Sequence, residues 1–293
     1  MLNGERALYF NHIPKTAGTS FYAVLDQRFT AASTCPFIGA VHLNEQPKEL
    51  WQGYQVYRGH FGMRLGEKLD DEPWMITMMR EPFAQELSSI RHRMREQTLY
   101  TDMPKMLAAA IEHPVNQEAL GMDYVGYLAA DYASLSPDEQ VAAACATLDR
   151  CLFVGLTDRF DDSMALLAYT MGWAMPEPVA RRNELPRDLA LEVPESVAAA
   201  IRERMGMAQA IYDHAVAKFE RDLTAMHRDL LGRMQRDLLA AEEPKEELLF
   251  RFDQPLVGRG WLPSSEVAGQ IPMRWAGPSR SWNSGCELIR TWS

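Results

Sequence analysis

Apolar and polar residues follow two alternating patterns along most of this 293-residue chain. Short runs rich in apolar residues predict buried strands, at 7–10, 55–60, 74–79 and 151–155. Longer stretches with apolar residues three and four positions apart predict helices, at 21–28, 82–94, 102–148, 164–171 and 194–243. Strands that alternate with helices favour an α/β fold, a three-layer domain with a central parallel sheet flanked by helices. In such a fold, ligands bind where the strands end.

Two segments depart from these patterns. Residues 31–50 carry several Pro and Gly residues and predict a loop, with a short helix near 47–51. The long helix expected over 194–243 contains Gly206 and Gly232, so we expect it to break or bend near one of them.

The composition changes near residue 248. Beyond this point Gly, Pro, Trp and Ser are spaced as in short strands and turns, and the helical period is lost. We therefore expect one domain over 1–247 and a short β-rich C-terminal extension over 248–293.

The connection between the first strand and the first helix is a turn of small residues. Pro14 ends the strand, and Lys15 is followed by a run of small and hydroxyl-bearing residues, namely Thr16, Ala17, Gly18, Thr19 and Ser20. The amides of such a turn and of the first helical turn have no backbone partners, and the helix dipole favours negative charge there. Lys15 adds a cation with three hydrogen-bond donors. The sequence therefore predicts a site for a phosphate-like group.

The order of residues in this loop differs from that of nucleoside-triphosphate loops. Those loops read GxxxxGK[ST], with the Lys after the second Gly and a hydroxyl for magnesium. Here Lys15 precedes Gly18. The loop is therefore shorter and directs its Lys differently, which disfavours a kinase-like use of ATP and magnesium.

With its neighbours, the stretch His12–Phe21 (HIPKTAGTSF) resembles the phosphosulfate-binding loop of sulfotransferases that use 3′-phosphoadenosine 5′-phosphosulfate (PAPS). The sequence of this stretch is most similar to that of carbohydrate sulfotransferases of the heparan-sulfate 2-O type and their bacterial relatives. A second signature of that family is an Arg at a strand end, an acidic residue and Pro next, and a Ser eight positions after the Arg. The matching residues are Arg80, Glu81, Pro82 and Ser88. The resemblance implies that Arg80 and Ser88 hold the 3′-phosphate, which suits a bidentate guanidinium and a hydroxyl.

His60 is the candidate general base. In the 2-O type enzymes a His in a Gly-His segment at a strand end removes the proton of the acceptor hydroxyl, and Gly59-His60 matches that placement. Its ordinary pKa near neutrality suits proton transfer at cellular pH. We interpret His12, inside the loop, as a positioning residue.

Overall charge and composition exclude several other classes of function. The formal net charge is −10, which argues against a general nucleic-acid binder because such a protein needs a basic stripe. No apolar run approaches the roughly 18 residues needed to span a bilayer, and the first strand begins too early for a signal peptide. The four Cys residues lack metal-site spacing, so we expect reduced thiols, no bound metal and a cytoplasmic protein.

Together these features predict a PAPS-dependent sulfotransferase that acts on a hydroxyl-bearing acceptor, a glycan or a glycolipid. Two alternatives remain, a phosphoryl transferase with a variant phosphate loop and a non-catalytic nucleotide- or glycan-binding protein. Neither the acceptor nor the oligomeric state is specified by these motifs.

In the C-terminal extension, residues 256–279 resemble the start of a β-rich module attached to glycan-modifying bacterial proteins. The residues that carry this resemblance are Trp261, Glu266, Arg274 and Trp275. That module would be truncated here, and the alternative is a plain β extension or a tail.

Overall fold

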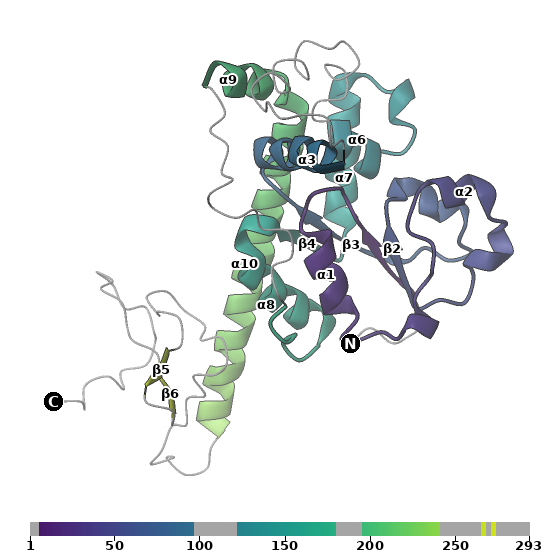
Figure 1. Cartoon of the computed structure of the whole chain (residues 1–293). Coiled ribbons are helices and arrows are strands. Elements are labelled where there is room, and N and C mark those ends of the chain that lie inside the picture. Colours follow the sequence, from purple (N-terminus) through teal and green to yellow (C-terminus); the bar gives the residue numbers. More distant parts are fainter. Residues whose placement is uncertain (1–5, 97–121, 180–194, 241–264, 268–270, 274–293) are drawn as a thin grey trace. The chain divides into compact units, whose positions relative to one another are not determined.

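A computed structural model of the chain describes residues 6–96, 122–179, 195–240, 265–267 and 271–273 (Figure 1). The chain divides into two compact units, Met1–Arg221 and Asp222–Ser293. The boundary lies within a long helix, α10 (Gly206–Ala240).

Four parallel strands form the central sheet of the first unit. They are β1 (Leu8–Asn11), β2 (Val56–Gly59), β3 (Trp74–Met79) and β4 (Phe153–Leu156), in the spatial order β2-β1-β3-β4. Most of their residues are buried, as expected for parallel strands with both faces covered. In register, Asn11 lies opposite Gly59 of β2 and Thr77 of β3, so the carboxyl ends of three strands meet at one edge.

Helices connect and cover these strands. Within the described residues, the α-helices are α1 (Gly18–Leu25), α2 (Val41–Glu45), α3 (Pro82–Glu96), α6 (Met122–Leu128), α7 (Pro137–Arg150), α8 (Phe160–Met171), α9 (Glu195–Glu203) and α10. Short 3-10 helices are η1 (Ala31–Ser33), η2 (Lys48–Trp51), η3 (Gly62–Glu67), η4 (Tyr132–Ser134) and η5 (Thr157–Arg159). The second unit contains the antiparallel pair β5 (Ser265–Val267) and β6 (Ile271–Met273).

Side chains alternate between the two faces of the sheet and give the first unit three layers (Figure 1). On one face, the Phe10 ring lies 4.3 Å from the Phe21 ring of α1. The end of α1 reaches the end of α8, because Arg28 donates to the Ala174 carbonyl at 2.5 Å. On the other face, Asn11 donates to the Tyr127 carbonyl of α6 at 2.8 Å. The expected α/β fold with a central parallel sheet flanked by helices is therefore confirmed.

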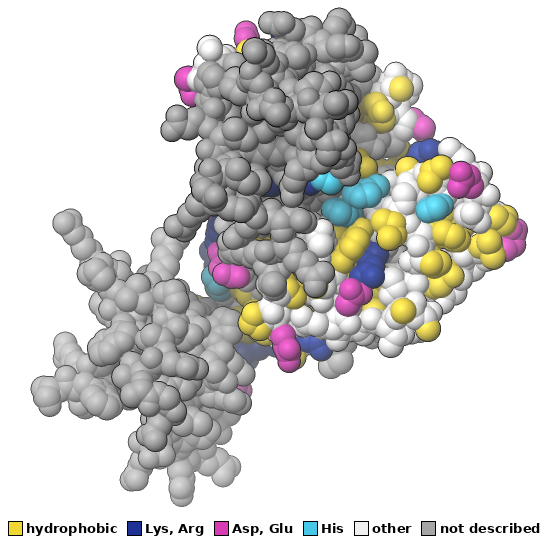
Figure 2. Space-filling view, viewed as in Figure 1, with side chains coloured by type: hydrophobic (Ala, Val, Ile, Leu, Met, Phe, Trp, Pro, Cys, Tyr) yellow, Lys and Arg dark blue, Asp and Glu magenta, His cyan; other side chains and the backbone are white. Residues whose placement is uncertain are grey.

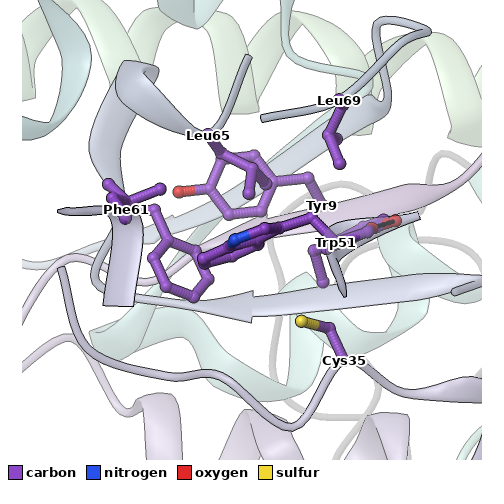
Figure 3. Packing of buried hydrophobic residues seen from close by; sticks show 8 residues of the cluster. Tyr9, Cys35, Trp51, Phe61, Leu65 and Leu69 are labelled. Atoms are coloured by element: carbon purple, nitrogen blue, oxygen red, sulfur yellow. Dashed lines mark hydrogen bonds between the residues drawn. The ribbon is translucent and has the colours of Figure 1, made fainter. Parts of the chain in front are cut away.

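A buried cluster fixes the segment between α1 and β2 onto the sheet (Figure 3). Trp51 is fully buried and meets the Phe61 ring edge-on, with 5.2 Å between ring centroids. Tyr9 of β1 packs in the same cluster and donates its hydroxyl to the Gly62 carbonyl at 3.0 Å. The residues around His60 are therefore held by the hydrophobic core.

Several details differ from the sequence-based expectation. Residues 41–45 form the helix α2, where only a loop was expected, because one buried residue, Leu43, is too little to give a helical period. The long C-terminal helix breaks just before Gly206 and runs on through Gly232. The helix expected over 102–148 is described only from Met122, as α6 and α7, and α7 begins at the capping box of Ser136. The 247/248 domain boundary and the module resemblance stay predictions; Trp261, Arg274 and Trp275 lie outside the described residues.

Candidate functional site

The loop between β1 and α1 has an unusual backbone. Lys15 and Ala17 adopt positive φ angles, 65° and 64°, on either side of Thr16, which does not. Positive φ is uncommon for residues other than Gly and costs free energy, so it persists where the surroundings impose it. Alternating signs of φ turn successive N–H groups toward one point, which creates a concave anion site.

Side chains bind four consecutive carbonyl oxygens of this loop. The pairs are His60 Nδ1 with the His12 oxygen at 2.8 Å, Thr16 Oγ1 with Ile13 at 2.8 Å, Gln85 Nε2 with Pro14 at 3.0 Å, and Arg80 Nη1 with Lys15 at 3.2 Å. Across a planar trans peptide, the N–H points opposite to the preceding C=O. The N–H groups of Lys15 and Thr16 are therefore directed away from Gln85 and Arg80, toward the concave side of the loop.

The N-terminus of α1 completes this cradle. Its N-cap residue is Ala17, and no side chain caps the helix among the residues described here. The first N–H groups of a helix have no intrahelical acceptor, and the dipole makes this end positive. Gly18 is required by close packing, since a Cβ at this position would lie 1.7 Å from His12 Nε2. The loop can hold a phosphate-like anion with backbone donors and the Lys15 ammonium.

The strand register places His60 beside the loop. Asn11 pairs with Gly59, so the next residues along, His12 and His60, become neighbours with ring centroids 4.4 Å apart. A carbonyl oxygen only accepts hydrogen bonds, so His60 Nδ1 must carry the proton that it donates to His12. In neutral His60 the lone pair is then on Nε2, the atom that a general base uses.

His12 is buried and stays neutral. Its Nδ1 lies 3.0 Å from the Tyr22 hydroxyl, and its ring stacks on Phe10. Burial, and to a smaller extent electrostatic repulsion from His60 and Lys15, together lower the pKa of His12 to about 3. This environment agrees with a positioning role for His12.

The lowered pKa of His12 predicts a pH dependence of stability. Between pH of about 6.5 and about 3, unfolded His12 binds a proton that the folded side chain does not, so the free energy of unfolding falls as pH is lowered. The fall is up to about 1.4 kcal/mol per pH unit for one proton. Urea unfolding of the wild type and of His12→Gln at several pH values measures it. A wild-type slope equal to that of the variant would contradict the account.

Arg80 and its neighbours link β3 to the loop. Glu81 accepts hydrogen bonds from the backbone N–H groups of Phe83 at 3.0 Å and Ala84 at 2.7 Å, so it acts as the cap of α3. The Tyr124 hydroxyl of α6 donates to the Arg80 carbonyl. The acidic residue of the Arg-Glu-Pro signature therefore has a structural role, which positions Arg80 at the end of β3.

The other predicted site residues with polar side chains are Thr16, Thr19 and Ser20 of the loop region and Ser88 of α3. Thr16 and Ser20 are buried, and Thr19 is exposed. Ser88 is half-buried on the face of α3 that carries Gln85, three residues earlier. Within the described residues no hydrogen bond joins Ser88 to the loop, so its role stays a prediction. The structure brings together Lys15, Arg80 and His60.

Sequence reasoning missed two residues of the site. Gln85 binds the loop, and Asn11 ties the end of β1 to α6. The only signal for Gln85 is its helical spacing from Ser88, which is too common to stand out. Asn11 is a fully buried polar residue in an otherwise apolar strand, a pattern that could have marked it.

The described part of the chain contains neither a cluster of metal-binding side chains nor a membrane-spanning helix. No group of three or more His, Cys, Asp or Glu residues there could hold a metal ion. None of the helices described combines the length and the apolar character needed to cross a membrane.

Comparisons with known proteins give similarities to solved structures only. No protein-family model matches the chain, and no curated protein matches it. Among solved structures, it is similar to a sulfotransferase from Alicyclobacillus acidocaldarius at 14% sequence identity and a TM-score of 0.40, over 74% of this chain and 99% of that chain. A similarity of this size establishes neither family nor activity, so the function below rests on the site residues.

Proposed function

We propose that this chain is a sulfotransferase that moves the sulfuryl group of PAPS to a hydroxyl of an acceptor. The proposal is supported above all by one juxtaposition. A loop whose carbonyls are bound by side chains, and whose N–H groups are directed the other way, carries Lys15 and lies against His60, which donates from Nδ1 and so keeps Nε2 for a proton. An anion cradle beside a His whose Nδ1 holds a proton and whose Nε2 can accept one fits transfer from an anionic donor to a hydroxyl.

The residues have distinct roles in this proposal. His60 Nε2 accepts the proton of the acceptor hydroxyl while the oxygen of that hydroxyl forms the new bond to sulfur. Lys15 and the loop N–H groups stabilise the negative charge on the 5′-phosphate oxygen as its bond to sulfur breaks. Arg80 and Ser88 bind the 3′-phosphate. PAPS itself supplies the activated sulfuryl group.

Transfer of a radioactive label tests the proposal against its two alternatives. The full chain is incubated with [35S]PAPS and a panel of polysaccharides, glycolipids and small alcohols, and in parallel with [γ-32P]ATP and magnesium. We expect 35S-labelled product and no 32P-labelled product. Transfer of 32P would support a phosphoryl transferase, and tight nucleotide binding without any transfer would support a binding protein.

Gln85 is expected to affect binding of PAPS more than turnover. Gln85→Leu keeps a similar volume but removes the hydrogen bond to the Pro14 carbonyl, which loosens the cradle. Loss of a hydrogen bond of about 1–1.5 kcal/mol corresponds to a KM for PAPS about 5- to 10-fold higher, with kcat changed less. Gln209→Leu, which removes a hydrogen bond to Asp213 on α10, is the control. An unchanged KM in Gln85→Leu would show that this bond does not position the loop.

A further inference from the structure

A run of apolar residues, most of them exposed, lies between α1 and β2. Residues 36–41 (PFIGAV), here called the apolar strip, contain no polar side chain. Two large hydrophobic side chains of the strip are exposed to solvent, Ile38 to 46% and Val41 to 54%. Exposed apolar residues that are grouped in this way mark a binding surface or favour aggregation.

Packing holds the apolar strip in this exposed position. Phe37 turns inward, and its ring centroid lies 4.8 Å from that of the buried Trp51. The distance between the ring centroids of Phe37 and His42 is 5.4 Å. One aromatic anchor in the core therefore fixes the backbone on either side. Ile38 and Val41 point outward on a supported segment.

The apolar strip is joined directly to the candidate base. The backbone N–H of His60 donates to the Ile38 carbonyl at 2.8 Å. Gly59 permits this approach, because a Cβ there would lie 2.4 Å from the same oxygen. Figure 2 shows hydrophobic side chains next to His side chains on the face over α2 and β2. The backbone of Ile38 is therefore fixed beside the backbone of His60, the candidate base.

The charges in residues 31–79, the segment that contains the apolar strip and His60, do not favour a polyanionic acceptor. Residues 31–79 contain four Lys or Arg and six Asp or Glu. Each of the four cations already has a partner: Lys48 with Asp70 at 2.7 Å, Arg58 with Asp26 at 2.6 Å, Arg64 with Asn44 at 2.9 Å, and Lys68 with the Gln46 carbonyl at 3.0 Å. A sulfated or uronic-acid polysaccharide needs cations that can turn to it.

We infer that the acceptor is an uncharged sugar with an apolar aglycone, a glycolipid-type molecule, and that Ile38 and Val41 bind the apolar part. This inference rests on the proposed sulfotransferase function, and it selects the glycolipid over the anionic polysaccharide. Contact with apolar surface strengthens binding in proportion to the area removed from water. The affinity of an acceptor therefore rises with the length of its apolar chain.

Calorimetric titration with n-alkyl β-glucosides tests the inference on the full chain saturated with 3′-phosphoadenosine 5′-phosphate. We expect the Kd to fall by about 10-fold from methyl to hexyl glucoside, a change that needs only part of the chain to be buried. In Ile38→Ser/Val41→Ser this dependence should be lost. Met175→Ser, which changes a 44% exposed Met elsewhere, is the matched control and should keep it.

Several outcomes would overturn the inference. They are no detectable binding of hexyl glucoside, a Kd independent of chain length, a dependence that survives in the double variant, or tighter binding of unsulfated heparosan oligosaccharides. Failure of the proposed function gives a different result. In that case [35S]PAPS gives no labelled product, with or without binding of the nucleotide, whatever the glucosides do.

Discussion

Replacement of His60 by Ala is expected to lower kcat for sulfuryl transfer by about 10²- to 10⁴-fold, the usual contribution of a general base. The variant loses the Nε2 lone pair and also the hydrogen bond to the His12 carbonyl. Because the remaining carbonyl contacts of the loop come from other residues, binding of 3′-phosphoadenosine 5′-phosphate should weaken far less. Initial rates with [35S]PAPS and calorimetric binding of the nucleotide measure the two effects separately.

Two comparisons make the His60 experiment specific. His214→Ala removes a His that pairs with Asp149 on α7, and it should keep wild-type rates. Added imidazole should restore part of the activity of His60→Ala, since it supplies a base to the vacated position. A rate for His60→Ala close to that of the wild type would show that another group removes the proton.

Replacement of Lys15 by Met should lower kcat/KM for PAPS by about 10²- to 10³-fold, as for loss of one preorganised donor at developing charge. Met keeps the length of the side chain and removes the ammonium. The backbone cradle stays, because the Lys15 carbonyl is bound by Arg80 and the Pro14 carbonyl by Gln85. Steady-state kinetics with varied PAPS gives the ratio.

The control for Lys15 is Lys48→Met, which removes an exposed cation paired with Asp70. It should leave kcat/KM unchanged, since surface ion pairs contribute little. A loss of less than about threefold in Lys15→Met would contradict the role given to the ammonium.

Local patterns in the sequence predict much of the sheet and part of the site. The run Trp74–Met79 is a strand with the expected bounds, and Pro82 begins α3. These features follow from neighbouring residues, because an apolar run between turn signals is typical of a buried strand and Pro fits a first helical turn. The strand–turn–helix order placed Lys15 correctly in the loop, but α1 already begins at Gly18, three residues before the expected start at 21.

The geometry that makes the loop a cradle depends on contacts distant in sequence. The Arg80 side chain reaches Lys15 across 65 positions, and Gln85 reaches Pro14 across 71. Positive φ at Lys15 and Ala17 is no local preference of these residue types, so the surroundings must impose it. Likewise, the proton on His60 Nδ1 follows from the register of β1 with β2, which a strand pattern alone does not specify.

The central claim is that the loop and Arg80 bind the two phosphate groups of one donor nucleotide. Calorimetric titration with 3′-phosphoadenosine 5′-phosphate and with 5′-AMP tests it most directly, because both ligands use the loop and only the first carries a 3′-phosphate. Hydrogen bonds to charged groups contribute about 1.5–3 kcal/mol, so we expect the first ligand to bind at least about 10-fold more tightly. Arg80→Met should remove most of that preference. Equal affinities for the two ligands in the wild type would contradict the claim.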